Sequence, residues 1–309
     1  MGKSSKDKRD IYYRLAKEEG WRARSAYKLI QINEEFNIFE KDCQSLTRVV
    51  DLCAAPGSWS QVLAKKLWEP KPDQERENVK IVAVDLQEMS PIPGIFQLQG
   101  DITNEITANE IITQFQGLKA QLVVCDGAPD VTGLHDIDEF IQHQLVLAAL
   151  NITTHVLEEG GTFIAKVFRG PESQLLFSQL RLFFPLEVVC AKPKSSRNSS
   201  AECFAVCRGY KPPIGYVPNM SNPLLLGDYD RDIEEFEGIN RIIVPFVCCG
   251  DLSGYDADTT YALDENYVYH APNQMPISPP YQEACERKKG KSGISNISSN
   301  LHDLSLVSD

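Results

Sequence analysis

A lysine inside an apolar run is the residue of this sequence best suited to chemistry. Lys166 stands in the segment Phe-Ile-Ala-Lys-Val-Phe, which predicts a buried strand. Burying an unpaired ammonium is costly, so the side chain either reaches solvent or has partners in a site. The candidate partners are Asp126, Glu202 and a second amine, Lys28. Such a cluster of amines and carboxylates indicates a functional site, and a purely structural ion pair is the alternative.

Four aspartates recur at the ends of successive predicted strands. They are Asp51, Asp85, Asp101 and Asp126. Open α/β sheets bind ligands at the carboxyl ends of their strands, so these acids are expected to lie at one edge. An acid in the place of Asp85 can accept both ribose hydroxyls of an adenosine, and Asp101 could meet the adenine edge. One aspartate after a strand is weak evidence for a ligand site, whereas an aspartate at the end of each of four successive strands is strong evidence.

The loop after the first strand, residues 51–59, limits the kind of ligand. It reads Asp-Leu-Cys-Ala-Ala-Pro-Gly-Ser-Trp and has one glycine, where a dinucleotide fold has Gly-x-Gly-x-x-Gly. A pyrophosphate is therefore poorly accommodated. The loop suits a smaller ligand that is cationic at sulfur and whose carboxylate lies on the loop amides. A tight turn that binds nothing is the alternative.

The elements that must position these residues alternate along the chain. Short apolar runs predict strands at residues 48–53, 79–86, 95–99, 122–125, 162–168, 186–190 and 203–207. Helical spacing predicts helices at residues 59–67, 107–115, 138–157 and 173–183, with one or two more in 10–39. Gly160 and Gly161 are expected to end the long helix at 138–157. This alternation predicts an α/β fold with a doubly wound sheet.

Charge divides the chain into regions despite a net charge of −12. Residues 1–28 carry nine Lys or Arg against four acids, and 181–212 carry six against two. Residues 226–286 carry thirteen acids against two bases. Phosphate binding depends on local clusters because salt screens charges beyond ~10 Å. The basic regions are therefore compatible with a nucleic acid, and a solvated basic helix is the alternative.

The cysteines, the histidines and the hydropathy argue against a metalloprotein, a disulfide-bonded protein and a membrane protein. The nine cysteines include no Cys-x-x-Cys pair and no His/Cys cluster has zinc spacing, so we expect reduced thiols and no metal. No apolar run approaches the ~20 residues that span a bilayer. The polar, basic start lacks the apolar region of a secretory signal. A cytoplasmic location without membrane association is expected.

The tetrad Lys28, Asp126, Lys166 and Glu202, with the segments DLCAAPGSWSQVL and VVCDGAPDVTG, resembles the FtsJ family of RNA 2′-O-ribose methyltransferases. All four tetrad positions match, and the resemblance spans about residues 5–209. It implies a Rossmann-like, seven-stranded sheet with helices on both faces. It also implies S-adenosylmethionine as cofactor and Lys166 as general base. The implied cofactor contacts are Gly57, Trp59, Asp85, Asp101 and Asp126.

Other segments, such as DVTGLHDIDEF and RIIVPFVCCGDLS, resemble the eukaryotic branch that methylates the tRNA anticodon loop, including the wobble nucleotide. That branch works with auxiliary proteins of WD-repeat and helical-repeat type. The same chemistry on ribosomal RNA or an mRNA cap, and a non-catalytic RNA-binding module, are the alternatives. Burial and Lys28 would lower the pKa of Lys166 while the two carboxylates would raise it, and the sequence leaves the balance open.

The resemblance and the charge pattern together predict four parts. Residues 1–46 form a basic helical extension that binds RNA, 47–209 the catalytic core, 210–285 an acidic, Pro-rich extension and 286–309 a disordered tail. The RNA-binding candidates are Lys6, Lys8, Arg9, Arg22, Arg24, Lys192, Lys194 and Arg197.

Overall fold

The computed structural model of the protein describes residues 10–39, 46–129, 132–171 and 173–220. Beyond these it describes 238, 253, 260–263, 265–270, 281 and 283–288. The chain divides into two units, Met1–Val244 and Pro245–Asp309. In the second unit, residues 283–288 are helical. The fold and the site below belong to the first unit.

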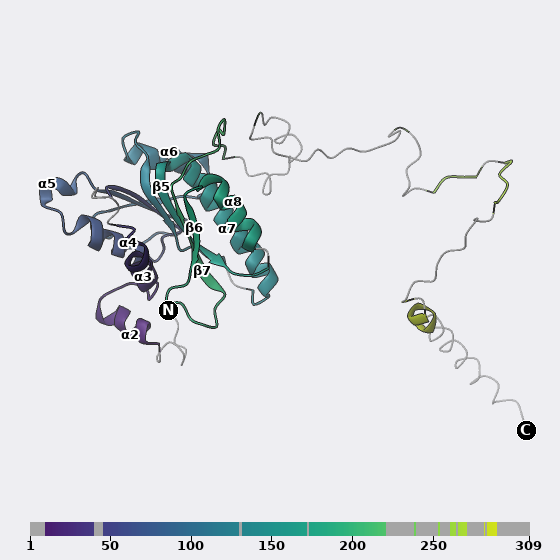
Figure 1. Ribbon diagram of the computed structural model, residues 1–309, viewed down its shortest axis with the longest axis horizontal. Coiled ribbons are helices and arrows are strands. Elements are labelled where there is room, and N and C mark those ends of the chain that lie inside the picture. The colour runs from purple at the N-terminus through teal and green to yellow at the C-terminus, as the bar shows by residue number, and fades with distance from the viewer. Residues whose placement is uncertain are drawn as a thin grey trace, which may run out of the picture. The chain divides into compact units, whose positions relative to one another are not determined.

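A seven-stranded sheet forms the centre of the first unit, in the order β3-β2-β1-β4-β5-β7-β6 (Figure 1). Its strands are β1 Arg48–Leu52, β2 Lys80–Asp85, β3 Ile95–Gln99, β4 Ala120–Cys125, β5 Leu157–Phe168, β6 Glu187–Ala191 and β7 Glu202–Arg208. All neighbouring pairs are parallel except those that β7 makes with β5 and β6. The predicted seven-stranded, doubly wound architecture is confirmed. The carboxyl ends of β1 to β5 meet at one edge.

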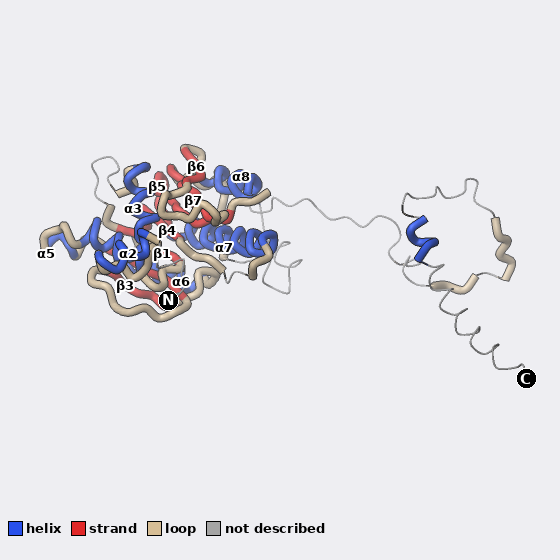
Figure 2. Tube along the Cα trace, turned by 90° about the horizontal axis from the view of Figure 1, so that it is seen from below, coloured by secondary structure: helices blue, strands red, loops and turns tan. Residues whose placement is uncertain are grey.

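Helices cover both faces of this sheet (Figures 1 and 2). One face carries α6 Glu105–Gln114, α7 His135–Val156 and α8 Ser173–Phe183. The other carries α3 Ala26–Phe36 and α4 Ser58–Leu63, which continues into the π-helical turn η2 Ala64–Trp68. Two short helices, α2 Ile11–Glu18 and α5 Asp73–Arg76, complete the set. The two faces follow from strand alternation, because Val49 belongs to one apolar cluster and Val50 to the other.

The long helix ends within one residue of the predicted position, but the two glycines after it do not form its cap. Gly160 and Gly161 were expected to stop it, but α7 ends at Val156 and β5 begins at Leu157. The glycines lie inside β5, next to a shift in register between β4 and β5. A Cβ on Gly161 would lie 2.8 Å from the carbonyl oxygen of Glu158. Glycine is needed here for a close approach within the irregular strand, not for a helix cap.

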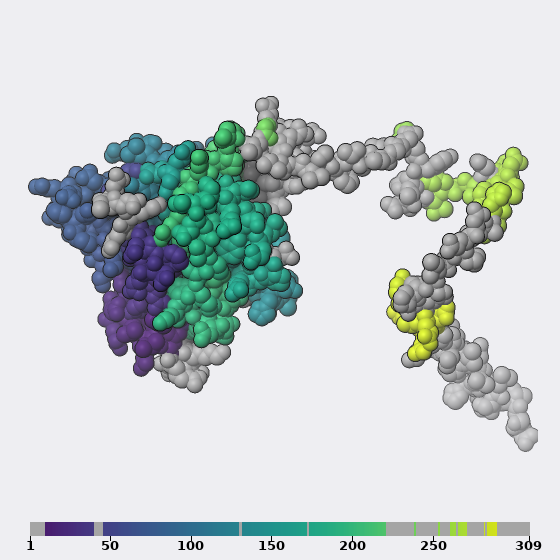
Figure 3. All heavy atoms as spheres, viewed as in Figure 1, coloured from purple at the N-terminus to yellow at the C-terminus, as the bar shows by residue number. Residues whose placement is uncertain are grey.

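Within the N-terminal region, the described helix α3 is part of the folded core. Ala26, Leu29 and Ile32 of α3 are at most 2% exposed and pack on the sheet. Figure 3 shows this segment, in purple, lying against the green surface of the last strands. At the other end, Tyr210 is buried and pairs with Gly161, so the ordered chain continues past β7. Among the described residues, no helix has the length and apolar character of a membrane span.

Candidate active site

Four elements bring the charged tetrad together. Lys166 lies near the end of β5, Asp126 follows β4, and Glu202 begins the antiparallel strand β7. Because β7 runs against β5, its first residue pairs with the last residue of β5, Phe168. The start of β7 therefore meets the carboxyl edge of the parallel strands. Lys28 reaches the same point from the first turn of α3.

The four side chains alternate in sign within ion-pair distance. Lys166 Nζ lies 2.9 Å from Asp126 Oδ1 and donates to the Asp126 backbone oxygen at 2.6 Å. Lys28 Nζ donates to Glu202 Oε2 at 2.6 Å and lies 3.7 Å from Asp126 Oδ1. The Lys166–Glu202 distance is 3.9 Å. Lys166 is 7% exposed, so the sequence-based prediction of a buried lysine with acidic partners agrees with this geometry.

The charges of this cluster stabilise one another. Burial lowers the pKa of Lys166, but the carboxylates of Asp126 and Glu202 outweigh it and hold that pKa above its usual value. Burial likewise raises the pKa of Glu202, yet Lys28 and Lys166 bring it below its usual value. The balance that the sequence leaves open therefore favours an ammonium at Lys166 in the protein alone.

A second group of polar residues holds the tetrad in place and was not found from the sequence. Ser196 Oγ donates to Glu202 Oε1 at 2.7 Å. The backbone N–H of Ser195 donates to Gln31 Oε1 at 2.8 Å. Gln142 Nε2 bridges the loop after β4 and the strand β5, donating to Lys166 O at 2.8 Å. Only the run of serines before Glu202 gave a sequence signal, and it carried no spacing that specifies a contact.

A pocket of about 1100 Å³ opens beside the tetrad at the carboxyl edge of the sheet. It is lined by the loops after β1, β2, β3 and β4 and by α7. Asp85, Asp101 and Asp126 all line it, as the strand-end pattern predicts. The Asp85 carboxylate accepts the backbone N–H groups of Ala55 at 2.9 Å and Gln87 at 2.8 Å. These bonds tie the loops after β1 and β2 together around the pocket.

Three residues of the segment 51–59, which runs from the end of β1 to the start of α4, lie differently from the pocket acids. Asp51 is 1% exposed and accepts a hydrogen bond from Ser60 Oγ at 2.6 Å; burial raises its pKa to about 7. Trp59 is 1% exposed, and its indole N–H donates to Ser25 O at 2.9 Å. Gly57 adopts φ +99°, which favours glycine. None of the three is among the residues that line the pocket, so Asp51 does not join the ligand-facing acids as expected.

The predicted RNA-binding residues have different surroundings. Lys6, Lys8 and Arg9 lie outside the described residues. Arg24 pairs with Asp10 and donates to Ser195 O, and Arg197 also reaches Asp10 at 3.4 Å. Lys192 donates to the carbonyls of Ser200 and Glu202. Lys194 is exposed in the loop that leads to Glu202, while Arg22 lines the pocket.

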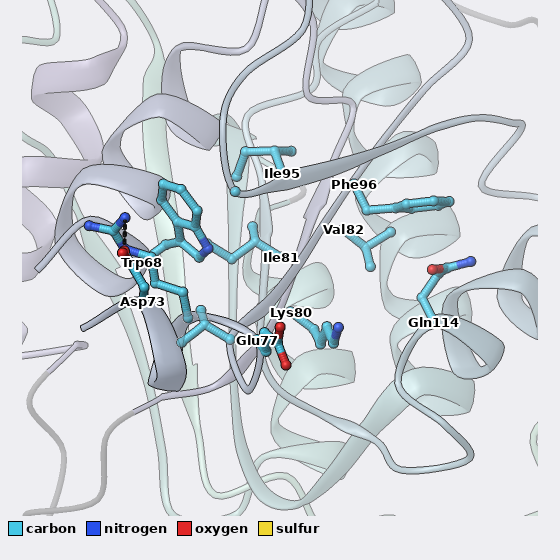
Figure 4. Close-up of a pocket in the computed structure, with 12 residues that line it drawn as sticks. Trp68, Asp73, Glu77, Lys80, Ile81, Val82, Ile95, Phe96 and Gln114 are labelled. Carbon is cyan, nitrogen blue, oxygen red and sulfur yellow. Dashed lines mark hydrogen bonds and ion pairs between the residues drawn. The ribbon is translucent and has the colours of Figure 1, made fainter. Parts of the chain in front are cut away.

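A second hollow, of about 540 Å³, lies at the β2–β3 edge of the sheet. Figure 4 shows Trp68 and Ile81 at one end and Phe96 and Gln114 at the other. Its charged side chains come from α5, from Glu77 directly after it and from the start of β2, and it contains no tetrad residue. Within the described part of the chain, no group of three or more His, Cys, Asp or Glu side chains is arranged to hold a metal ion.

The sheet order, the pocket at its carboxyl edge and the lysine–carboxylate cluster together define a Rossmann-like methyltransferase. The chain belongs to the FtsJ-like methyltransferase family, whose model matches residues 21–210. Members of this family use S-adenosylmethionine as a general property.

Relatives in other organisms match nearly the whole chain. The mouse tRNA (cytidine(32)/guanosine(34)-2′-O)-methyltransferase is 61% identical over 94% of this chain and 87% of its own length. The Schizosaccharomyces pombe protein of the same name is 53% identical over 94% of this chain and 99% of its own. A crystal structure of a Plasmodium falciparum protein described as a ribosomal RNA methyltransferase is similar at 26% identity. It has a TM-score of 0.51 and covers 62% of this chain and 98% of its own.

Proposed function

We propose that this protein methylates the ribose 2′-hydroxyl of tRNA anticodon-loop nucleotides, using S-adenosylmethionine. The observation that carries the proposal is the buried Lys166 ammonium, which touches Asp126 at the rim of a pocket of about 1100 Å³. The relatives that match 94% of the chain are named for nucleotides 32 and 34, which supports the anticodon loop as the target.

The pocket has the chemistry that this cofactor requires. Asp85 stands where an acid can accept the ribose hydroxyls, and Asp101 stands beside it at the end of β3. Phe140 and Leu145 of α7 add an apolar wall. When bound, S-adenosylmethionine supplies an electrophilic methyl group on a positively charged sulfur. Asp126 lines the same pocket and places a negative charge there.

The tetrad would orient the ribose and receive its proton. Lys166 Nζ is held by both the carboxylate and the carbonyl oxygen of Asp126, which fixes its direction. Lysine accepts a proton only when it is neutral, and its neighbours here favour the charged form. A positive charge brought into the pocket lowers the pKa of a nearby ammonium. Lys166 therefore becomes a base most readily in the loaded enzyme, with Lys28 and Glu202 holding the ribose in place.

RNA binding falls to the surface of the loop that leads to Glu202. Lys194 is exposed there, and Lys192 and Arg197 lie in the same loop. From the sequence, Lys6, Lys8 and Arg9 remain candidates for RNA binding as well. We also propose that separate auxiliary proteins of WD-repeat and helical-repeat type select the nucleotide, and that the protein works in the cytoplasm.

Mapping of ribose methylation in cells tests this function. Cells that lack the protein should lose 2′-O-methylation in tRNA anticodon loops, and wild-type protein should restore it. The variant Lys166→Ala should fail to restore it, with turnover at least about 100-fold lower, because base catalysis contributes ~10²–10⁴. It should still bind S-adenosylmethionine. Loss of methylation confined to ribosomal RNA or mRNA caps would overturn the tRNA assignment, and near-normal turnover of Lys166→Ala would overturn the role of the lysine.

A further inference from the structure

Arg22 connects two loops at the mouth of the cofactor pocket. Its guanidinium donates through Nη1 to Pro56 O at 3.0 Å and through Nη2 to Pro91 O at 2.9 Å. Its backbone N–H donates to Gln61 Oε1 at 2.8 Å, which fixes the start of the side chain over α4. The side chain also lies close to Gly57, where an added Cβ would be 2.8 Å from Nη1. Arg22 is thus held against the loop that follows β1.

The charges around the pocket leave one place for an anion. Four of the residues that line it are acidic: Asp85, Glu88, Asp101 and Asp126. Arg22 is the one basic residue among the described residues that line it. The proposed cofactor carries a sulfonium, an ammonium and a carboxylate. The two cationic groups suit the acids, whereas the carboxylate would be repelled by them unless a cation faces it.

Three N–H groups of the first loop, those of residues 54, 55 and 57, are engaged within the protein. The N–H of Ala54 donates to Val84 O at 3.1 Å, and that of Gly57 to Ala54 O at 2.7 Å. The N–H of Ala55 donates to the Asp85 carboxylate at 2.9 Å, and Pro56 has none. Residues 54–57 therefore have no backbone N–H left for a carboxylate, which limits the backbone donors of the predicted loop 51–59 to its other residues. Within the described residues, Arg22 donates its side-chain hydrogens to two carbonyls, and a guanidinium has five N–H groups.

We propose that Arg22 binds the α-carboxylate of the cofactor's methionine moiety, and that this, not RNA binding, is its role. This inference rests on the proposed function, because it concerns the same cofactor. It assigns the two carbonyl bonds of Arg22 a purpose: they hold the guanidinium at the pocket wall and leave three of its five N–H groups for a ligand. A planar guanidinium that is held in this way can bind a carboxylate with two parallel hydrogen bonds.

The proposal is tested with two ligands, one that has the carboxylate and one that lacks it. Their affinities are measured by calorimetry and, for the weaker ligand, by ligand-observed NMR. S-adenosylhomocysteine has the amino-acid moiety, and 5′-deoxy-5′-methylthioadenosine lacks it. In the full-length protein, Arg22→Met should weaken S-adenosylhomocysteine about 10- to 100-fold, the value of a charged hydrogen bond. It should change methylthioadenosine binding by less than about twofold, and Arg22→Lys should recover part of the loss. Arg14→Met, which removes an exposed charge on α2, is the control and should change neither.

The outcomes separate this inference from the proposed function. Unchanged S-adenosylhomocysteine affinity in Arg22→Met would overturn the inference, and so would a loss confined to RNA affinity. An equal loss for both ligands would also overturn it, because Arg22 would then only hold the two loops together. Wild-type protein that does not bind S-adenosylhomocysteine would instead contradict the proposed function.

Discussion

Lys28 Nζ lies 2.6 Å from Glu202 Oε2, whereas Lys166 Nζ lies 3.9 Å from the same oxygen. The tetrad is therefore two ion pairs that touch, with Lys28 on Glu202 and Lys166 on Asp126. This division gives the two lysines different main partners, so that they can be tested separately. Glu202 acts on Lys166 mainly through its field, because it makes no hydrogen bond with Lys166 at this distance.

The pH dependence of methyl transfer tests this division. Glu202 raises the pKa of Lys166, so Glu202→Gln should make the lysine lose its proton at lower pH. If Lys166 is the base, the single-turnover rate of wild type rises with pH as the neutral amine forms. In Glu202→Gln that rise should move toward lower pH, even where the maximum rate is reduced. Single-turnover rates across pH 6 to 10, roughly the range in which amines titrate, provide the measurement. If the pH–rate profile of Glu202→Gln coincided with that of wild type, Glu202 would have no influence on the pKa of the base.

Much of the site follows from the sequence for a simple reason. Strand ends of parallel sheets meet at one edge, so Asp85, Asp101 and Asp126 could be placed together from chain order alone. Contacts between segments far apart could not be. Ser195 meets Gln31 across 164 residues, through a loop whose path depends on the folded surface beneath it. The direction of the Trp59 side chain could not be predicted either, because a residue at the start of a helix can face either the ligand or the core.

Ser196 is a positioning residue for Glu202. Its hydroxyl donates to Glu202 Oε1 at 2.7 Å, opposite the oxygen that Lys28 holds. Ser196→Ala removes a hydrogen bond to a charged group, and should lower kcat about tenfold. The KM for S-adenosylmethionine should not change, since Ser196 is not among the residues that line the pocket. Steady-state kinetics give both values, and Ser178→Ala on the exposed face of α8 is the matched control. A lower melting temperature of Ser196→Ala, together with the lower kcat, would indicate a structural role instead.

Asp51 makes the stability of the fold depend on pH. Its pKa rises from 3.8 to about 7 on folding because the carboxyl is buried. The unfolded chain thus releases this proton at lower pH than the folded one does. Stability therefore falls as pH rises from 3.8 to about 7 and does not fall further above it. The contribution lost is on the order of 4 kcal/mol.

Asp51→Asn removes this titration while keeping an oxygen for the Ser60 hydroxyl. Urea unfolding of wild type and variant at about pH 5 and pH 8 isolates the effect, because other groups cancel in the double difference. The free energy of unfolding should fall more in wild type than in Asp51→Asn between these two conditions. Equal falls would mean that Asp51 keeps an ordinary pKa in the folded protein.

Lys194 provides the cleanest test of the proposed RNA-binding surface. Other predicted RNA-binding residues, such as Arg24 and Arg197, make ion pairs within the protein. Arg24 and Arg197 both contact Asp10, so replacing them would disturb the loop over Glu202 as well as the surface charge. Lys194→Ala changes an exposed amine in the loop that leads to Glu202. If this amine contacts a phosphate, the slope of log Kd against log salt should fall by about 0.7 to 0.9.

The weakening should be similar for tRNAs of different sequence, since phosphate contacts carry no base information. Lys119→Ala is the matched control: it is exposed, but it precedes β4 at the opposite edge of the sheet. Filter binding or fluorescence anisotropy at several salt concentrations gives both slopes. A salt slope that changes equally in the two variants would show that net charge, and not this surface, governs RNA affinity.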